Sequence, residues 1–223
     1  EHEEADDGGN GESPVELNGA EQQTEFRDSL TGQRLVPELV REARRRELEY
    51  FVAKQVWVKV PREEARLRQG KPPISIKWVD VNKGDDDAPN YRSRLVAREV
   101  RQAWEDTIFS PTPPLESLRS ILSLAATDLP GRPRHDRRPE SPTRTQVSVI
   151  DISRAYFNAV VEESKPTFVE LPHEDPDRAR GMCGQIRVHL YGTRPAAKGW
   201  HTEFSETLEE MGFTMGIASA CVF

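Results

Sequence analysis

The sequence predicts an α+β fold in which antiparallel sheets are packed by helices. Apolar residues recur at helical spacing over residues 37–55, and further along the chain they alternate with polar residues in short runs of β type. Two of these runs are separated by the polar segment Lys83–Asn90 (KGDDDAPN), whose Gly, Asp, Asn and Pro content is typical of a turn. Strands joined by a short turn pair in antiparallel fashion.

The same patterns place the individual elements. A first helix is expected over Pro37–Gln55, and a second over Leu115–Thr127 with Leu118, Ile121, Leu122 and Ala125 at core spacing. The predicted strands are Val56–Val60, Ile74–Val81, Arg92–Arg98, Val147–Ile150, Thr167–Leu171 and Gln185–Leu190. Ala155–Val161 is expected to form the start of a helix, and another helix is expected over Pro195–Met211, stopping at Gly212.

The net charge of −7 belongs to the first thirty residues. Residues 1–30 hold ten acidic residues and one basic residue, whereas residues 31–223 carry a net charge of +2. The first segment has too few apolar side chains to offset the entropy lost on ordering. We therefore expect residues 1–30 to be a disordered acidic tail, with a short helix near Glu21–Leu30 as the alternative, and residues 31–223 to fold.

Several classes of protein are excluded by composition. No apolar run approaches the ~18 residues of a membrane-spanning helix, and the polar start of the chain is unlike a secretory signal. The two cysteines and the scattered histidines show no spacing of a disulfide framework or a zinc site. These features predict an intracellular protein that is not secreted, has no membrane partner and binds no zinc.

One carboxylate follows an apolar run. Asp151 comes directly after Val147–Ile150 and precedes small and aromatic residues. A carboxylate at the end of a strand is well placed to bind Mg²⁺, which prefers hard oxygen ligands. An Asp at a strand–helix junction is also a common helix N-cap, so this pattern alone leaves both roles open.

Four stretches in a fixed order indicate a family. The stretches are LVREARRRELEYFVAKQVWVKVP with IKWVDVNKG, then YRSRLVAREV, then VSVIDISRAYFNAVVEE, and finally LYGTRPAAKGW with LEEMGF and ACVF. On these stretches the sequence resembles, from about Pro37 to Phe223, the reverse transcriptase of copia-type LTR retrotransposons. The third is similar to the family's Asp-Val-Lys-Thr-Ala-Phe-Leu-Asn-Gly motif, and the fourth to its Leu-Tyr-Gly-Leu-Lys-Gln-Ala-Pro-x-x-Trp segment.

The resemblance implies a fingers–palm polymerase in which Asp151 is the first catalytic carboxylate and binds two magnesium ions. Ile152 would contribute only its backbone carbonyl to a metal. Arg154 and Ala155 match the turn whose backbone faces the incoming triphosphate. Tyr156 matches the steric gate beside the sugar, where the family usually has Phe; a plain core aromatic is the alternative.

The resemblance also implies phosphate and template contacts. Arg92 and Arg94 match the basic fingers strand that clamps nucleotide phosphates, for which the arginine fork is suited; ordinary exposed bases are the alternative. Tyr191 and Gly192 match the turn that supports nucleotide and template. The implied ligands are an RNA or DNA template–primer and a deoxynucleoside triphosphate.

The family's Asp-Asp hairpin, which completes the two-metal site, has no counterpart in these residues, nor have the thumb and ribonuclease H regions. We therefore expect a fragment of a polyprotein, truncated before the hairpin and inactive alone, whose parent performs templated DNA synthesis in a cytoplasmic particle or the nucleus. The alternatives are a non-catalytic nucleic-acid-binding remnant, supported by the basic strand and the Arg-rich residues 132–144, and an unrelated α/β domain with a structural Asp151.

Overall fold

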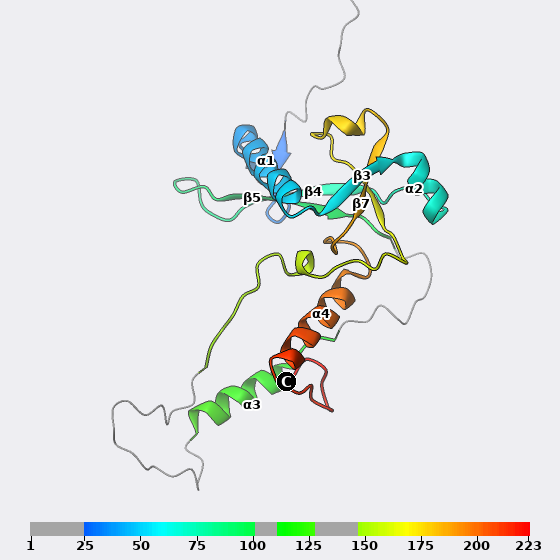
Figure 1. Cartoon of the computed structure of the whole chain (residues 1–223). Coiled ribbons are helices and arrows are strands. Elements are labelled where there is room, and N and C mark those ends of the chain that lie inside the picture. Colours follow the sequence, from blue (N-terminus) through cyan, green and yellow to red (C-terminus); the bar gives the residue numbers. More distant parts are fainter. Residues whose placement is uncertain (1–24, 101–110, 128–146) are drawn as a thin grey trace, which may run out of the picture.

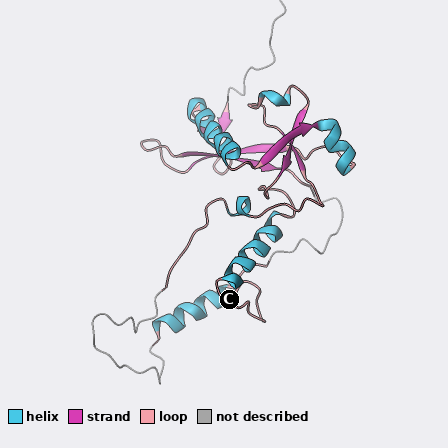
Figure 2. Ribbon diagram, viewed as in Figure 1, coloured by secondary structure: helices cyan, strands magenta, loops and turns pink. Residues whose placement is uncertain are grey.

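The computed structural model describes residues 25–100, 111–127 and 147–223. Helices and antiparallel sheets are mixed along the chain (Figures 1 and 2), which confirms the α+β class. The helices are α1 (Pro37–Ala53), α2 (Arg62–Gln69), α3 (Leu115–Ala126), α4 (Ala196–Glu210) and the short 3-10 helices η2 (Ala155–Asn158) and η3 (Pro176–Arg178). The strands are β1 (Phe26–Arg27), β2 (Arg34–Leu35), β3 (Trp57–Pro61), β4 (Ile76–Asn82), β5 (Tyr91–Ala97), β6 (Phe168–Glu170) and β7 (Met182–Ile186).

Two sheets carry most of the folded part. Strands β4 and β5 form an antiparallel pair with Val79 opposite Arg94, as the turn between them predicts. Strand β7 lies between β3 and β6 and is antiparallel to both. An isolated parallel bridge between Ile74 and Val169 connects β6 to the segment that leads into β4. The fold therefore joins residues that lie about one hundred positions apart in the sequence.

Helix α1 covers the inner face of β5. It begins at Pro37. Proline suits this position because the first-turn N–H that it lacks would have no partner within the helix, and because its fixed φ is already helical. Its buried side chains include Val40, Ala43 and Phe51, which recur at helical spacing. Phe51 belongs to a core that draws on the β4–β5 and β3–β7–β6 sheets and on η2, whereas Val40 packs with Phe26 and Leu35 of the β1–β2 hairpin. The fully packed members of this core are Phe51, Val56, Ile74, Leu95, Ala97, Phe157, Val161, Val169, Ile186 and Leu190.

One predicted strand is wrong, and one predicted helix forms but does not pack as its spacing indicated. Residues 147–150 form no strand, and the side chains of Val149 and Ile150 are 93% and 84% exposed. Helix α3 forms where expected, but it buries no residue among those described. It lies away from the sheets in the view of Figure 1. Both segments have the apolar pattern of a packed element and lack a partner within the described part of the chain.

The boundary predicted at residue 30 also differs from the structure. Residues 25–30 of the predicted acidic tail belong to the fold, because Phe26 pairs with Leu35 in a small hairpin and is buried. The Asp28 carboxylate accepts backbone N–H groups from Leu30, Thr31 and Asn82. These bonds lower the pKa of Asp28. Residues 1–24 of the tail, and the Arg-rich residues 132–144, lie outside the described residues.

One α-helix and the short 3-10 helix η3 had no predicted counterpart. Helix α2 begins after Pro61 and ends at Gly70, whose left-handed backbone (φ 69°) terminates it. It buries only Ala65, so its apolar periodicity is too weak to detect. No helix among the described residues is both long enough and apolar enough to cross a membrane.

Candidate functional site

Strand β5 presents arginines on one face and packing residues on the other. Arg92 and Arg94 are exposed, whereas Ser93 and Leu95 are buried toward α1. This alternation follows from the two-residue period of a strand. On β4, Val81 lies opposite Arg92 and Val79 opposite Arg94, so apolar neighbours surround the two bases on the exposed face. The two guanidinium groups are thereby offered to a ligand from a rigid element.

Three segments distant in sequence meet beside Arg94. Its guanidinium carbon lies 5.5 Å from the centroid of the Tyr191 ring. That ring contacts the Tyr156 ring, with 4.7 Å between centroids, and the Phe157 ring, with 5.6 Å. Cation–π and tilted aromatic contacts of this kind stabilise a fixed arrangement. The structure therefore brings Arg94, Tyr156 and Tyr191 into one cluster.

The two neighbouring aromatic residues of η2 have different surroundings. Phe157 is fully buried among Phe51, Tyr50 and Tyr191, so it is a core residue. Tyr156 remains partly exposed and packs on Tyr191. Because Phe157 anchors η2 in the core, the backbone that carries Tyr156 is fixed.

The Arg154 side chain contacts helix α1. Its Nη2 lies 2.5 Å from the Glu47 carboxylate, and its guanidinium carbon lies 3.8 Å from the centroid of the Tyr50 ring. Both partners are on α1. The Arg154 backbone is left-handed, with φ 51° and ψ 46°, and precedes Ala155 at the start of η2. What this turn exposes toward a ligand is consequently its backbone and Tyr156 rather than the Arg154 guanidinium.

The Tyr191–Gly192 turn is tied to the end of β5. The Ala97 N–H donates to the Tyr191 carbonyl at 2.8 Å, and the Glu99 N–H donates to the Gly192 carbonyl at 3.3 Å. The Glu99 carboxylate in turn accepts the Arg194 N–H at 2.7 Å. Burial raises the pKa of the Tyr191 hydroxyl.

Substituting Gly192 with alanine is expected to destabilise the fold and displace Tyr191. The residue has φ 81°, and a Cβ there would lie 2.0 Å from the Ala97 carbonyl oxygen. A left-handed non-glycine residue costs about 1–3 kcal/mol, and the clash adds to this. Gly181→Ala is the matched control, because Gly181 has φ 75° and open space around it. Equal losses in urea denaturation for both variants would show that the close approach to β5 is unimportant.

Asp151 lies on an irregular segment that precedes η2. It is exposed and follows the extended residues 147–150, which run toward η2 (Figure 1). No group of three or more His, Cys, Asp or Glu side chains that could hold a metal occurs in residues 25–100, 111–127 and 147–223. Its position three residues before Arg154 leaves it within reach of the turn that carries Tyr156.

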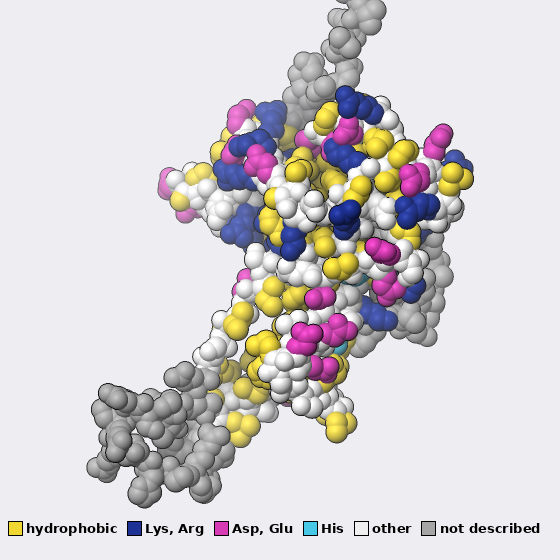
Figure 3. Space-filling model, in the orientation of Figure 1, with side chains coloured by type: hydrophobic (Ala, Val, Ile, Leu, Met, Phe, Trp, Pro, Cys, Tyr) yellow, Lys and Arg dark blue, Asp and Glu magenta, His cyan; other side chains and the backbone are white. Residues whose placement is uncertain are grey.

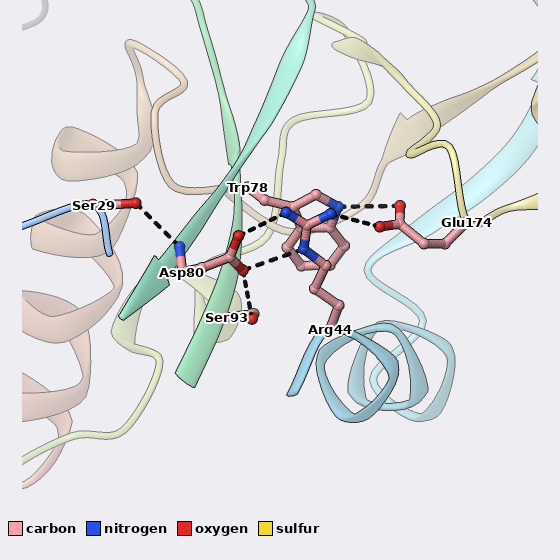
Figure 4. Close-up of polar contacts among 6 residues, drawn as sticks. All are labelled: Ser29, Arg44, Trp78, Asp80, Ser93 and Glu174. Atoms are coloured by element: carbon pink, nitrogen blue, oxygen red, sulfur yellow. Dashed lines mark hydrogen bonds and ion pairs between the residues drawn. The ribbon is translucent and has the colours of Figure 1, made fainter. Parts of the chain in front are cut away.

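A buried ionic network, which the sequence did not reveal, supports β5 from behind (Figure 4). The Arg44 guanidinium contacts both oxygens of the Asp80 carboxylate, at 3.2 and 2.6 Å, and donates to Glu174 at 2.9 Å. The Ser93 hydroxyl donates to Asp80 at 2.6 Å, and the Trp78 indole N–H donates to Glu174 at 3.1 Å. Since Ser93 lies between Arg92 and Arg94 on the opposite face, this network fixes the strand that presents them.

A cavity of about 890 Å³ lies beside the first turn of α4. Its lining includes Arg194 and Lys198, but bases and carboxylates are almost balanced. The charged residues are Lys71, Arg98, Lys165, Arg194 and Lys198 with Glu99, Glu162, Glu203 and Glu206. On the face drawn in Figure 3, basic and acidic side chains are mixed over the upper part with the sheets and α1, whereas acidic ones predominate on the part below. Electrostatics therefore favours β5 over this cavity for phosphate.

The sequence is similar to known polymerases. The family model described as "Reverse transcriptase (RNA-dependent DNA polymerase)" matches residues 58–223. The "Retrovirus-related Pol polyprotein from transposon TNT 1-94" of Nicotiana tabacum is 28% identical over 165 residues, which are 70% of this chain and 11% of that polyprotein.

Two Arabidopsis thaliana relatives agree with this. The Pol polyproteins from transposons RE1 and RE2 are 24% and 25% identical over 161 residues, covering 67% of this chain and 10% of each relative. The chain thus spans about a tenth of the length of these curated relatives. No solved structure matches. With the family model matching well over half of its residues, the chain belongs to the reverse transcriptase (RNA-dependent DNA polymerase) family, in its copia-type branch.

Proposed function

We propose that this chain forms the fingers and part of the palm of a retrotransposon reverse transcriptase, and that it holds nucleotide and template for DNA synthesis. The observation that carries the proposal is the cluster of Arg94, Tyr156 and Tyr191, which come from three separate segments. All three match nucleotide-site positions in the family's motifs. Residues that bind the same nucleotide must lie close together, as these three do.

The residues of this site would have different roles in binding a nucleotide. Arg92 and Arg94 offer planar forks that pair with phosphate oxygens in bidentate fashion. The Tyr156 ring, held against Tyr191, restricts the space beside the sugar and so disfavours a 2′-hydroxyl. Ala155 and the left-handed Arg154 present backbone N–H groups at the start of η2, and such turns favour anions.

The residues of this chain could supply only part of a magnesium site. The Asp151 carboxylate and the Ile152 carbonyl are oxygen ligands of the kind that Mg²⁺ prefers, but an octahedral ion takes six. The other positions would be filled by water, triphosphate oxygens and carboxylates from outside the described residues. Two ions bound in this way in the complete parent enzyme would neutralise the charge that develops during nucleotidyl transfer.

The complete catalytic set therefore requires more of the polyprotein. Under this proposal the Asp-Asp hairpin, the thumb and the ribonuclease H region come from the remainder of the parent, in a cytoplasmic particle or the nucleus. The 223-residue chain by itself should not extend a primer. Measurable primer extension by the isolated chain that is abolished in Asp151→Asn would overturn this part of the proposal.

A non-catalytic nucleic-acid-binding role is the second candidate. The observation that favours it is that β5 presents its basic face within the described residues, whereas no group of three or more potential metal ligands occurs among them. Both candidates predict nucleic-acid binding by β5. They differ in whether the chain, continued into the rest of its polyprotein, extends a primer.

The salt dependence of template–primer binding tests the role of β5. Each phosphate that the protein no longer neutralises should reduce the slope of log K against log salt by about 1. We expect the double variant Arg92→Gln/Arg94→Gln to lower the slope by about 2 in fluorescence anisotropy titrations. The control is Arg45→Gln/Arg46→Gln on α1, whose guanidinium groups are paired with Glu42 and, for Arg45, also with Glu49. Equal slopes for both double variants would remove β5 from the interface.

A further inference from the structure

Arg154 departs from the motif that this segment resembles. The fourth residue of the family's Asp-Val-Lys-Thr-Ala-Phe-Leu-Asn-Gly motif is Thr, and this chain has Arg there. The residue also has a left-handed backbone, which is unfavourable for a side chain with a Cβ atom. A non-glycine residue persists in this conformation when its surroundings determine it. Its side-chain contacts therefore need an explanation.

Those contacts join the turn to helix α1. Glu47 is 4% exposed, and its carboxylate pairs with the Arg154 guanidinium at 2.5 Å. A buried carboxylate without such a partner would be strongly destabilising. Tyr50, one turn further along α1, lies under the same guanidinium at 3.8 Å. Arg154 is thus bound by charge and by stacking to one face of one helix.

The turn that Arg154 anchors is the one that carries the candidate nucleotide site. The Phe157 N–H donates to the Arg154 carbonyl at 2.9 Å, and the Ala159 N–H donates to the Tyr156 carbonyl at 3.2 Å. Tyr50 packs on Phe157 as well as on Arg154. A displacement of the Arg154 side chain would therefore be passed to the backbone of η2.

We infer that Arg154 is a positioning residue, which pins the turn before Tyr156 to α1 through Glu47 and Tyr50 and does not itself bind phosphate. The inference rests on the proposed function, because the turn matters only if it faces a nucleotide. It separates Arg154 from Arg92 and Arg94, whose guanidinium groups are exposed. It also makes Glu47, which touches no ligand, a determinant of nucleotide affinity.

The first experiment compares dATP binding in the presence of Mg²⁺ and template–primer. Glu47→Gln and Arg154→Lys should each weaken dATP binding by at least about tenfold, as loss of an orienting partner usually does. Glu42→Gln is the control, since it breaks an exposed ion pair on the same helix. A purely structural role predicts that Glu47→Gln lowers stability but leaves the affinity of the folded protein unchanged, and this result would overturn the inference.

A second measurement does not depend on nucleotide binding. Hydrogen exchange of the backbone amides of residues 153–157 should accelerate in Glu47→Gln by more than the change in global stability explains, and not in Glu42→Gln. Acceleration no greater than the global change would refute the positioning role. If the wild-type chain binds no dATP but the exchange result is as expected, the proposed function fails while the anchoring of the turn stands.

Discussion

Replacing Asp80 with alanine is expected to lower the free energy of unfolding by about 3–5 kcal/mol, because it leaves the buried Arg44 guanidinium without its main counter-ion. Asp80 is 6% exposed and Arg44 is 8% exposed. The Arg44 guanidinium also packs over the Phe26 and Trp78 rings, at 4.8 and 5.1 Å, so it cannot easily turn toward solvent. Urea denaturation followed by tryptophan fluorescence measures the loss.

Two further variants serve as comparisons for Asp80→Ala. Ser93→Ala removes one hydrogen bond to the Asp80 carboxylate and should cost only about 1 kcal/mol. Glu42→Ala breaks exposed pairs with Arg45 and Arg46, and it should change stability little because solvent screens such pairs. If Asp80→Ala proves no more harmful than Glu42→Ala, the network of Figure 4 does not hold β5 in place.

Asp151→Asn should abolish nucleotidyl transfer in a polymerase that contains this chain together with the rest of its reverse transcriptase region. The neutral amide is a poor ligand for Mg²⁺, and a loss of about 4 kcal/mol of charge stabilisation slows the reaction at least about a thousandfold. The side chain is exposed, so the melting temperature should stay unchanged. Primer extension in single-turnover conditions is the measurement.

The control for Asp151 is another exposed carboxylate. Asp86 lies in the polar turn between β4 and β5 and is exposed, so Asp86→Asn should retain full activity. An Asp151→Asn enzyme within about tenfold of the wild-type rate, a loss of only about 1.4 kcal/mol, would assign Asp151 a structural role instead. The helix N-cap role that its sequence position also allowed is wrong, because η2 begins at Ala155 with Arg154 in the N-cap position and no side chain caps it.

The elements that could be predicted from sequence are those whose pattern is local. Helices α1 and α4 and the β4–β5 hairpin have periodicity, a proline or glycine boundary, or a turn within a few residues. Strand β7 was predicted a few residues too late, at Gln185–Leu190. It contains Gly184, where a Cβ would lie 3.0 Å from the Trp57 ring, so the packing favours glycine at this position. Glycine is uncommon inside strands, and its presence weakened the strand pattern in the sequence.

Long-range pairings could not be predicted from the chain alone. Asp80 and Glu174 are separated by 36 and 130 positions from Arg44, and no local pattern links the three residues. The apolar spacing of α3 correctly indicated a helix but could not say what covers it. Only the resemblance to a family placed Arg94 and Tyr191 in the same site. Periodicity indicates which face of an element a residue occupies, but it does not indicate which residue it contacts.

Photoaffinity labelling of this chain with a photoreactive dATP analogue, in the presence of Mg²⁺ and template–primer, tests the central claim most directly. We predict that the label is found by peptide mapping in residues 91–97, 152–157 and 190–193, which carry Arg94, Tyr156 and Tyr191. Excess unlabelled dATP should prevent labelling, and Arg92→Gln/Arg94→Gln should reduce it. Label confined to other segments, or label that dATP does not displace, would contradict the account.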